Sequence, residues 1–213
     1  MSNQLKAVPL VAPGHTRPIT HLSFSPLLDD GTYLLISSCK DGNPMLREWT
    51  GDWIGTFVGH KGAVWCTKLS HDGSRAASGS ADFTACVSLS YCAYLQVVCS
   101  PTHPRKRCAC YSKVWDTYSG QSLHSFPHNH IVRSVAISSS YLLTGGQEKK
   151  VRIFDIGKPD AEPDILSEGG SQSHDGTIKS VVWFDENTGV SGGEDRMIKW
   201  VIACLSLVIF LRR

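Results

Sequence analysis

Four histidines mark a repeating pattern of apolar and polar positions along the chain. The positions four, seven and nine residues after each histidine are mostly apolar. From the first repeat to the fourth they are Ile19, Leu22 and Phe24; Val64, Thr67 and Leu69; Val132, Val135 and Ile137; and Ile178, Val181 and Trp183. The step from the seventh to the ninth position has the period of two that places both side chains on one face of a β-strand. The pattern therefore predicts an inner strand after each histidine.

A second strand is predicted after each inner strand, and an acidic turn residue follows it. The four sequences are "YLLISS", "SRAASGS", "YLLTGG" and "TGVSGG", and a hydroxyl residue stands four positions before each acid. The hydroxyl residues are Ser37, Ser78, Thr144 and Ser191, and the acids are Asp41, Asp82, Glu148 and Asp195. An offset that recurs in all four copies indicates one repeated structural unit.

The spacing of the units becomes regular once one segment is removed. The repeat histidines are His15, His60, His128 and His174. They are separated by 45, 68 and 46 residues, and leaving out the 27 residues 86–112 reduces the middle spacing to 41. We therefore delimit the repeats at about 14–58, 59–126 (interrupted by the insert 86–112), 127–172 and 173–200.

The end of each unit identifies the repeat type. Six residues after the acid, the second copy has Trp115 and Asp116 when the insert is left out, and the third has Phe154 and Asp155. A unit that opens on Gly-His and closes on Trp-Asp resembles a WD repeat. The two end copies depart from this rule, with Arg47 and Val201 at the closing position.

Short strands at even spacing predict an all-β fold, a WD-repeat β-propeller of about four blades in a single partial domain over residues 1–213. An outer strand is expected before each histidine, in "DWIGTFVGH", "GQSLHSFPH" and "EPDILSEGGSQSH", and "KAVPLVAPGH" near the N-terminus has the same form. The fourth copy matches the repeat through Trp200, so we expect the chain to stop within that blade. Residues 201–213 form an apolar tail that is shorter than the roughly 20 residues a spanning helix needs, and an apolar strand or an irregular tail is expected there.

Composition narrows the function classes. A formal net charge of +2 argues against a dedicated nucleic-acid-binding chain. The N-terminal sequence lacks a secretory signal pattern, so a cytoplasmic or nuclear location is expected. Five of the eight cysteines fall within residues 86–110, spaced C-x5-C-x6-C-x8-C-x-C, which lacks the paired ligands of a structural zinc site. No metal and no cofactor is expected, because no phosphate-binding loop, His-Glu-x-x-His or nucleophile elbow is found.

The histidine, hydroxyl and acid of each repeat have the residue types of a catalytic triad, and Ser78, His60 and Asp82 occur in one unit. A catalytic site needs one activated nucleophile, however, whereas this set recurs around the chain. We therefore expect a structural hydrogen-bond network and no enzyme. The residues assigned to it are His15, Ser37, Asp41, His60, Ser78, Asp82, Trp115, Asp116, His128, Thr144, Glu148, Phe154, Asp155, His174, Ser191 and Asp195.

Several stretches resemble the family of serine-threonine kinase receptor-associated proteins, also called unr-interacting proteins. They include "GHTRPIT", "CKDGNPMLREWTGDWIGTFVGHKGAVW", "YLLTGGQEKKVRIFDIGKPDAEP" and "GGEDRMIKW", over roughly residues 12–85 and 113–200. The resemblance fails in the insert and after Trp200. It implies a seven-bladed WD-repeat scaffold of which this chain is the N-terminal part. It also implies partners in the survival-of-motor-neuron complex, which assembles spliceosomal ribonucleoproteins, and in receptor serine/threonine kinase signalling.

Two alternatives remain open. A direct RNA-binding propeller would use Trp53 and Trp65 as stacking platforms, although their places on strands favour core packing. Alternatively, the chain is a non-functional truncated splice form. Residues 86–112 interrupt a strand, where insertions are least tolerated, which is typical of translated intron sequence.

Overall fold

The structure is a computed structural model that describes residues 11–81, 110–120, 122–166, 173–202 and 207–211. These residues form strands, turns and loops and contain no helix, so none of them forms a helix long and apolar enough to cross a membrane. The strands are grouped into four antiparallel sheets of four strands each. The all-β propeller architecture predicted from the sequence is confirmed.

Each sheet is a blade whose strands follow one another in chain order, from the inner strand to the outer one. Blade 1 contains β1 (Ile19–Phe24), β2 (Leu34–Cys39), β3 (Met45–Glu48) and β4 (Trp53–Thr56). Blade 2 contains β5 (Val64–Leu69), β6 (Arg75–Ser80), β7 (Cys110–Asp116) and β8 (Ser122–His128). Blade 3 contains β9 (Val132–Ile137), β10 (Tyr141–Gly146), β11 (Val151–Asp155) and β12 (Asp164–Leu166). Blade 4 contains β13 (Ile178–Trp183), β14 (Thr188–Gly193), β15 (Ile198–Ile202) and β16 (Leu207–Leu211).

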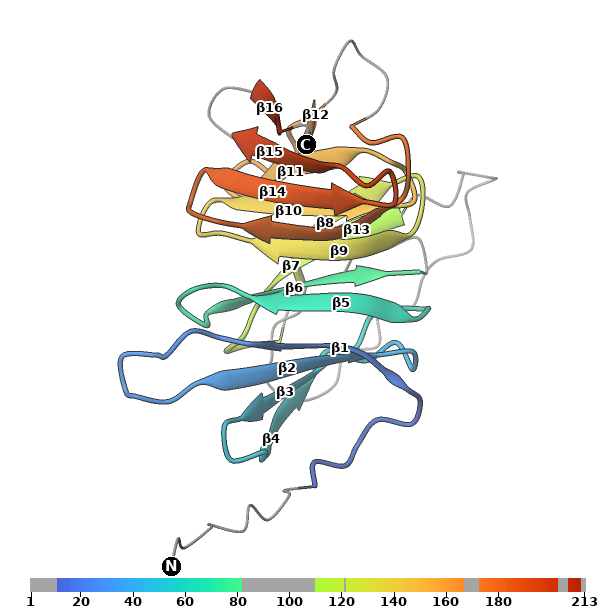
Figure 1. Ribbon diagram of the computed structural model, residues 1–213. Helices are drawn as coiled ribbons and strands as arrows, with labels where there is room; N and C mark the ends of the chain where they lie inside the picture. Colours follow the sequence, from blue (N-terminus) through green and yellow to red (C-terminus); the bar gives the residue numbers. More distant parts are fainter. Residues whose placement is uncertain (1–10, 82–109, 121, 167–172, 203–206, 212–213) are drawn as a thin grey trace, which may run out of the picture.

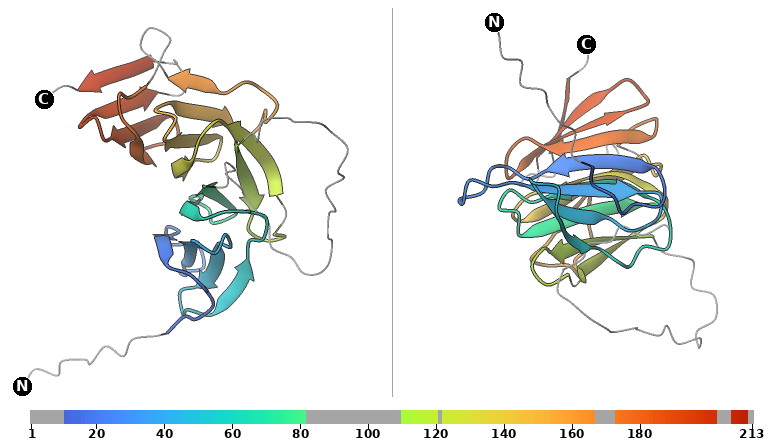
Figure 2. Two further views of the ribbon diagram at one scale, coloured as in Figure 1. Left: turned by 90° about the vertical axis from the view of Figure 1, so that its right-hand side faces the viewer. Right: turned by 90° about the horizontal axis from the view of Figure 1, so that it is seen from below.

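The blades lie face to face along an arc, with blade 1 and blade 4 at its two ends (Figures 1 and 2). The inner strands lie next to one another in the order β1, β5, β9 and β13. One apolar core joins the first three blades and includes Phe57, Trp115 and Phe154; a second, with Leu143 and Ile178, joins blades 3 and 4. Burying side chains of this size stabilises the packing by about 1.5–3 kcal/mol each.

The apolar positions of the inner strand differ in burial between blades. Val135 and Ile137 are 0% and 8% exposed in blade 3, whereas Leu22 and Phe24, at the same positions of blade 1, are 53% and 58% exposed. These side chains point toward the preceding blade, and no described sheet lies on that side of blade 1. The apolar face of the inner strand of blade 1 is therefore exposed.

A β-bulge interrupts every inner strand at the same place. In blade 1 the pairing passes from Ile19 opposite Cys39 to His21 opposite Ser38, which leaves Thr20 as the extra residue. The corresponding extra residues of the other blades are Trp65, Arg133 and Lys179. Because a bulge changes the direction of a side chain and is frequent beside functional sites, these four positions bear on the site described below.

Two expectations about the chain are corrected by the strand pairing. The insert was expected to leave blade 2 up to residue 112, but Cys110, Tyr111 and Ser112 are part of β7 and pair with β8. Residues 86–109 lie outside the described residues. The chain was expected to stop within blade 4, but Leu207–Leu211 pairs with β15 and supplies the fourth strand of this blade. This strand agrees with the apolar strand that was expected for the tail. Backbone pairing of this kind needs apolar, extended segments rather than particular residues.

The N-terminal segment does not supply an outer strand within the described residues. Residues 6–10 lie outside them, and residues 11–15 lead into β1 without forming a strand.

Candidate functional site

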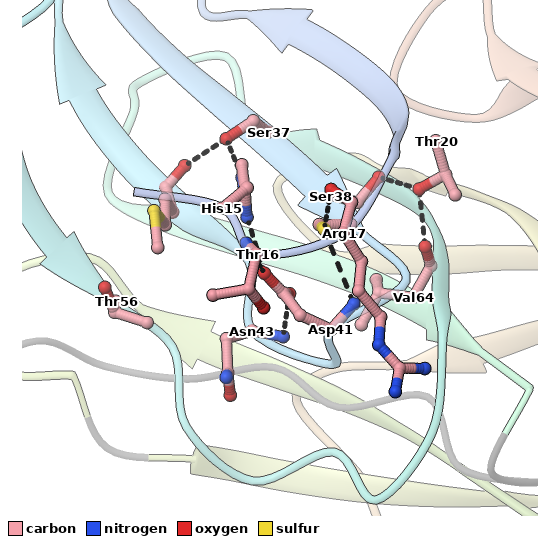
Figure 3. A network of polar contacts seen from close by, with 12 residues as sticks. His15, Thr16, Arg17, Thr20, Ser37, Ser38, Asp41, Asn43, Thr56 and Val64 are labelled. Carbon is pink, nitrogen blue, oxygen red and sulfur yellow. Dashed lines mark hydrogen bonds and ion pairs between the residues drawn. The ribbon is translucent and has the colours of Figure 1, made fainter. Parts of the chain in front are cut away.

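Blade 1 contains a closed polar network around His15 (Figure 3). The Nε2 atom of His15 lies 2.8 Å from the hydroxyl oxygen of Ser37 on β2, and Nδ1 lies 3.1 Å from Oδ2 of Asp41 in the turn after β2. The backbone amides of Thr16 and Asn43 donate to the same carboxylate. The side chains of His15 and Asp41 are 7% and 8% exposed, so the network connects the segment before β1 to two elements of its blade away from solvent.

The surroundings of Asp41 favour its ionised form. Burial raises the pKa of this carboxyl, but hydrogen bonds from the Asn43 amide, the Thr16 amide and His15 act in the opposite direction, and its pKa lies below the usual value. A charged Asp41 is the form that accepts all of these hydrogen bonds.

Blade 4 repeats this geometry. The ring of His174 lies 2.8 Å from the Ser191 hydroxyl through Nε2 and 2.8 Å from Oδ2 of Asp195 through Nδ1. The backbone amides of Asp175 and Met197 donate to the Asp195 carboxylate. Burial lowers the pKa of His174 despite the adjacent carboxylate.

In blade 2, the histidine and serine at the corresponding positions are joined by a tryptophan. Nε2 of His60 lies 2.9 Å from the hydroxyl oxygen of Ser78, and Nε1 of Trp115 donates to that oxygen at 3.4 Å. The rings of His60 and Trp115 meet edge to face, and Trp115 also packs on Phe57. Asp82, the acid assigned to this network, lies outside the described residues.

Blade 3 has different partners for its acid. Both carboxylate oxygens of Glu148 accept from the guanidinium of Arg152, and Asn129 also donates to Glu148. The hydroxyl of Thr144 has no hydrogen-bond partner among the described residues, although it is buried. Burial, with the nearby charge of Arg152, lowers the pKa of His128 to about 3, and its ring meets Phe154 edge to face.

The closing positions of the repeats also differ in chemistry. Asp116 and Asp155 accept the backbone amides two residues further on, at 2.9 and 2.8 Å, and so stabilise the turns after β7 and β11. In blade 1, Arg47 occupies the position of Trp115. Its guanidinium is buried and donates to the carbonyl oxygens of Gly51 and Pro13.

The histidine networks have the connectivity of a Ser-His-Asp triad but not its accessibility. Ser37, Ser78 and Ser191 are 4%, 2% and 0% exposed. A nucleophile must reach the atom it attacks. Three copies of a buried hydroxyl bonded to histidine can hold strands and turns together, but they cannot receive a substrate without rearrangement.

A possible metal-ligand set also lies in blade 1, where donor atoms of His15, Cys39 and Asp41 are within 4.8 Å of one another. Burial raises the pKa of the Cys39 thiol, which donates to the carbonyl oxygen of Arg17 at 2.8 Å. Zinc binds the thiolate rather than the thiol. This donor set does not fit a metal, because its sulfur is kept protonated and hydrogen-bonded.

The bulged inner strands surround a second kind of site. A cavity of about 260 Å³ lies on the inner side of the blades and is lined chiefly by Thr20, His21, Trp65, Lys68, Arg133 and Lys179. Three of the four bulge residues are Trp65, Arg133 and Lys179, so the repeated backbone irregularity brings an indole and two cations to one place. Sequence reasoning missed this cluster, although these residues share one offset, five positions after the repeat histidine.

The two tryptophans considered for RNA stacking occupy different environments, and neither lies in the core. Trp53 is 61% exposed on β4, where its indole N–H donates to Thr56. Trp65 is half-buried at the cavity, with Lys40 and Arg133 lying 5.7 and 5.0 Å from the centre of its ring. The expectation of core packing is wrong for both residues.

Comparison with known proteins agrees with the fold and the repeats. The WD40 family (WD domain, G-beta repeat) matches residues 51–87 and 120–155. Serine-threonine kinase receptor-associated proteins from Gallus gallus and Homo sapiens are each 42% identical over 198 residues, which are 92% of this chain and 47% of theirs. The protein of that name from Dictyostelium discoideum is 38% identical over 85% of this chain and 52% of its own length.

More distant similarities concern proteins with other names. Eukaryotic translation initiation factor 3 subunit I from Culex quinquefasciatus is 26% identical over 90% of this chain. The crystal structure of the computationally designed Ika4 protein superposes with a TM-score of 0.61 at 21% identity, covering 90% of this chain and 95% of that one, a likeness of fold alone. The chain spans about half the length of the serine-threonine kinase receptor-associated proteins that it matches.

Proposed function

The chain is a WD-repeat protein similar over 92% of its length to the serine-threonine kinase receptor-associated proteins, and on this premise we propose that it acts as a non-enzymatic scaffold for protein–protein interaction. The sequence identity of 42% to these proteins carries the proposal. Rigid blades that present loops to other proteins suit this role, because binding residues are concentrated on loops held by a scaffold.

The burial of the triad-like hydroxyls supports a function without catalysis. The three serines bonded to the repeat histidines are at most 4% exposed, and each belongs to a separate blade. In this proposal the networks stabilise the blades and take no part in chemistry.

The name of the relatives supports a more specific proposal about the partners of this chain. The name of the relatives states association with a receptor serine-threonine kinase, and we extend it to receptor kinase signalling by this chain. We also propose a place in the survival-of-motor-neuron complex, in the assembly of spliceosomal ribonucleoproteins and hence in mRNA splicing, within the cytoplasm, the nucleus or both. RNA is expected to reach this chain chiefly through other subunits.

Affinity purification tests the proposal. The tagged full chain is expressed in cells, and co-purified proteins are identified by mass spectrometry against the tag alone. Recovery of receptor kinases or of motor-neuron-complex components is expected. Recovery of neither would contradict the finer assignment, and the absence of any specific protein would contradict the scaffold role itself.

A nuclease-treated sample and a salt series separate direct RNA binding from protein binding. Contacts to phosphates release counterions, so direct RNA retention should weaken steeply between 50 and 200 mM salt. Partners that survive nuclease treatment are held by protein contacts, which is the expected result.

A further inference from the structure

We propose that the cavity on the inner side of the blades is a recognition site for an oxyanion on a partner peptide, a glutamate or aspartate carboxylate or a phosphate ester. The inference rests on the proposed scaffold function and assigns a binding site to it. The ligand group would be held by Trp65 and Arg133, with Lys68 and Lys179 completing a basic wall.

The charges around the cavity favour an anion. Lys68 on β5, Arg133 on β9 and Lys179 on β13 line it, and Lys40 lies over Trp65 from the turn after β2. Outside the cavity lining, Glu194 pairs with Lys179 at 2.5 Å, and both side chains are about half exposed. No acid is among the described residues that line the cavity, so Lys68 and Arg133 have no carboxylate partner there.

Hydrogen-bond donors at the cavity are also unpaired. The indole nitrogen Nε1 of Trp65 and the Nε nitrogen of Arg133 are shielded from solvent and have no hydrogen-bond partner among the described residues. Leaving a buried donor unpaired is unfavourable, so an acceptor that reaches both nitrogens would relieve two such groups at once. A guanidinium edge is suited to the paired oxygens of a carboxylate or phosphate.

The ring of His21 provides a third polar group. Its pKa is lowered by burial and by the charge of Lys68, while a hydrogen bond to the backbone of Thr67 opposes this shift. Nδ1 of His21 has no hydrogen-bond partner in the described part of the chain. A bound anion would favour protonation of this nitrogen, and binding should therefore strengthen on mild acidification.

A peptide fits the site better than RNA. Lys40 and Arg133 already lie 5.7 and 5.0 Å from the centre of the Trp65 ring, so a base would have to compete with two cations for the ring face. Base stacking needs the face of the ring. The donors instead converge from strands of different blades on a cavity of about 260 Å³, which suits one anionic side chain.

Fluorescence anisotropy with defined probes tests the inference. The probes are a labelled glycine- and glutamate-containing decapeptide, the same peptide with glutamine for glutamate, the same peptide with phosphoserine for glutamate, and a single-stranded RNA decamer. We expect both anionic peptides to bind at least about tenfold more tightly than the glutamine peptide, in keeping with the strength of hydrogen bonds to charged groups. The comparison of glutamate with phosphoserine identifies the source of the oxyanion.

Matched variants localise the binding. R133Q removes the charge, and W65F removes the indole N–H together with part of the ring, so each should weaken binding of the anionic peptides, R133Q by about tenfold or more. K158Q removes an equal charge at an exposed position after β11 and should leave binding unchanged. Thermal unfolding of each variant shows whether the blade is intact.

The possible failures can be told apart. Equal binding of the glutamate and glutamine peptides, wild-type affinity in folded R133Q, or R133-dependent binding of RNA alone would overturn the inference. If R133Q retains all co-purified partners, the scaffold function stands and the cavity is not its site. If the wild-type chain recovers no partner but binds the anionic peptides with dependence on Arg133, the oxyanion site stands and the scaffold function fails.

Discussion

The hydroxyl oxygen of Ser191 lies 2.8 Å from Nε2 of His174, and both residues are almost fully buried in blade 4. The other ring nitrogen of His174 is bonded to Asp195. The serine therefore satisfies a buried nitrogen, and the two hydrogen bonds hold the histidine against β14 and the turn that follows it.

Removing this hydroxyl should destabilise the protein. Ser191→Ala leaves Nε2 of His174 without its partner, and we expect the free energy of unfolding in urea to fall by about 1–3 kcal/mol. Thr144→Val is the matched control, because the Thr144 hydroxyl at the same repeat position has no hydrogen-bond partner among the described residues. Thr144→Val should lower the free energy of unfolding only slightly or even raise it. An equal decrease in both variants would show that the lost hydrogen bond is not the cause.

Arg47 should not be replaceable by the tryptophan of the repeat pattern. Its guanidinium donates to the carbonyl oxygens of Gly51 and Pro13 and ties the segment before β1 to blade 1. Arg47→Trp removes both hydrogen bonds from the charged guanidinium, and we expect a loss of about 1–3 kcal/mol in urea unfolding. Arg47→Lys keeps the charge but supplies a different donor geometry, so an intermediate loss is expected. A stabilised Arg47→Trp variant would contradict the role given to these hydrogen bonds.

Two neighbouring residues between β4 and β5 should differ strongly in the effect of truncation on stability. Phe57 is 1% exposed and packs on Trp115 with ring centres 5.6 Å apart, whereas Val58 is 74% exposed. Phe57→Ala should reduce the free energy of unfolding by about 3–5 kcal/mol, because it removes a large side chain from the core shared by the blades. Val58→Ala should change it by less than about 0.5 kcal/mol. Chemical denaturation followed by tryptophan fluorescence measures both.

The contact between blades 2 and 3 should be sensitive to acid through His128, which ends β8 and packs on Phe154. Burial and Arg152 hold its pKa at about 3 in the folded protein, well below the ordinary value of 6.5. Between these values the unfolded chain binds more protons than the folded one, so the stability is fully present above about pH 6.5 and decreases as the pH falls toward 3. The loss over this range is on the order of a few kcal/mol.

Replacing His128 alone isolates this contribution. In His128→Gln the decrease in urea stability from pH 6.5 downward should be flatter than in the wild type, even if the variant is less stable at neutral pH. His130→Gln, which removes an exposed histidine two residues away, should retain the wild-type slope. A His128→Gln slope equal to that of the wild type would contradict a buried, neutral His128.

Much of the architecture could be predicted because it depends on local periodicity. The period of two after each histidine specifies the inner strands, and the fixed offset from Ser37 to Asp41 specifies the second strand and its turn. These are properties of the backbone and of neighbouring residues, and the sequence contains both. The number of sheets followed from counting the repeats.

The partners of individual side chains could not be predicted in the same way. Glu148 stands at the position of Asp41, yet it is bonded to Arg152, because an arginine four residues further along the chain offers two charged donors. Arg47 replaces a tryptophan, and its contacts with Gly51 and Pro13 depend on where the segment before β1 crosses the blade. Such choices are made by competition among groups that only folding brings together.

By itself, then, the sequence determined that this protein is built from repeated four-stranded antiparallel blades, since hydrophobic periodicity and turn chemistry act over a few residues. Only the tertiary structure decided that residues 110–112 and 207–211 complete β7 and β16, and that Trp65, Arg133 and Lys179 meet around one cavity. Strand completion depends on which backbone edge is open, and the cavity depends on a bulge in every inner strand. Both are relations between segments far apart in the chain, which no local pattern encodes.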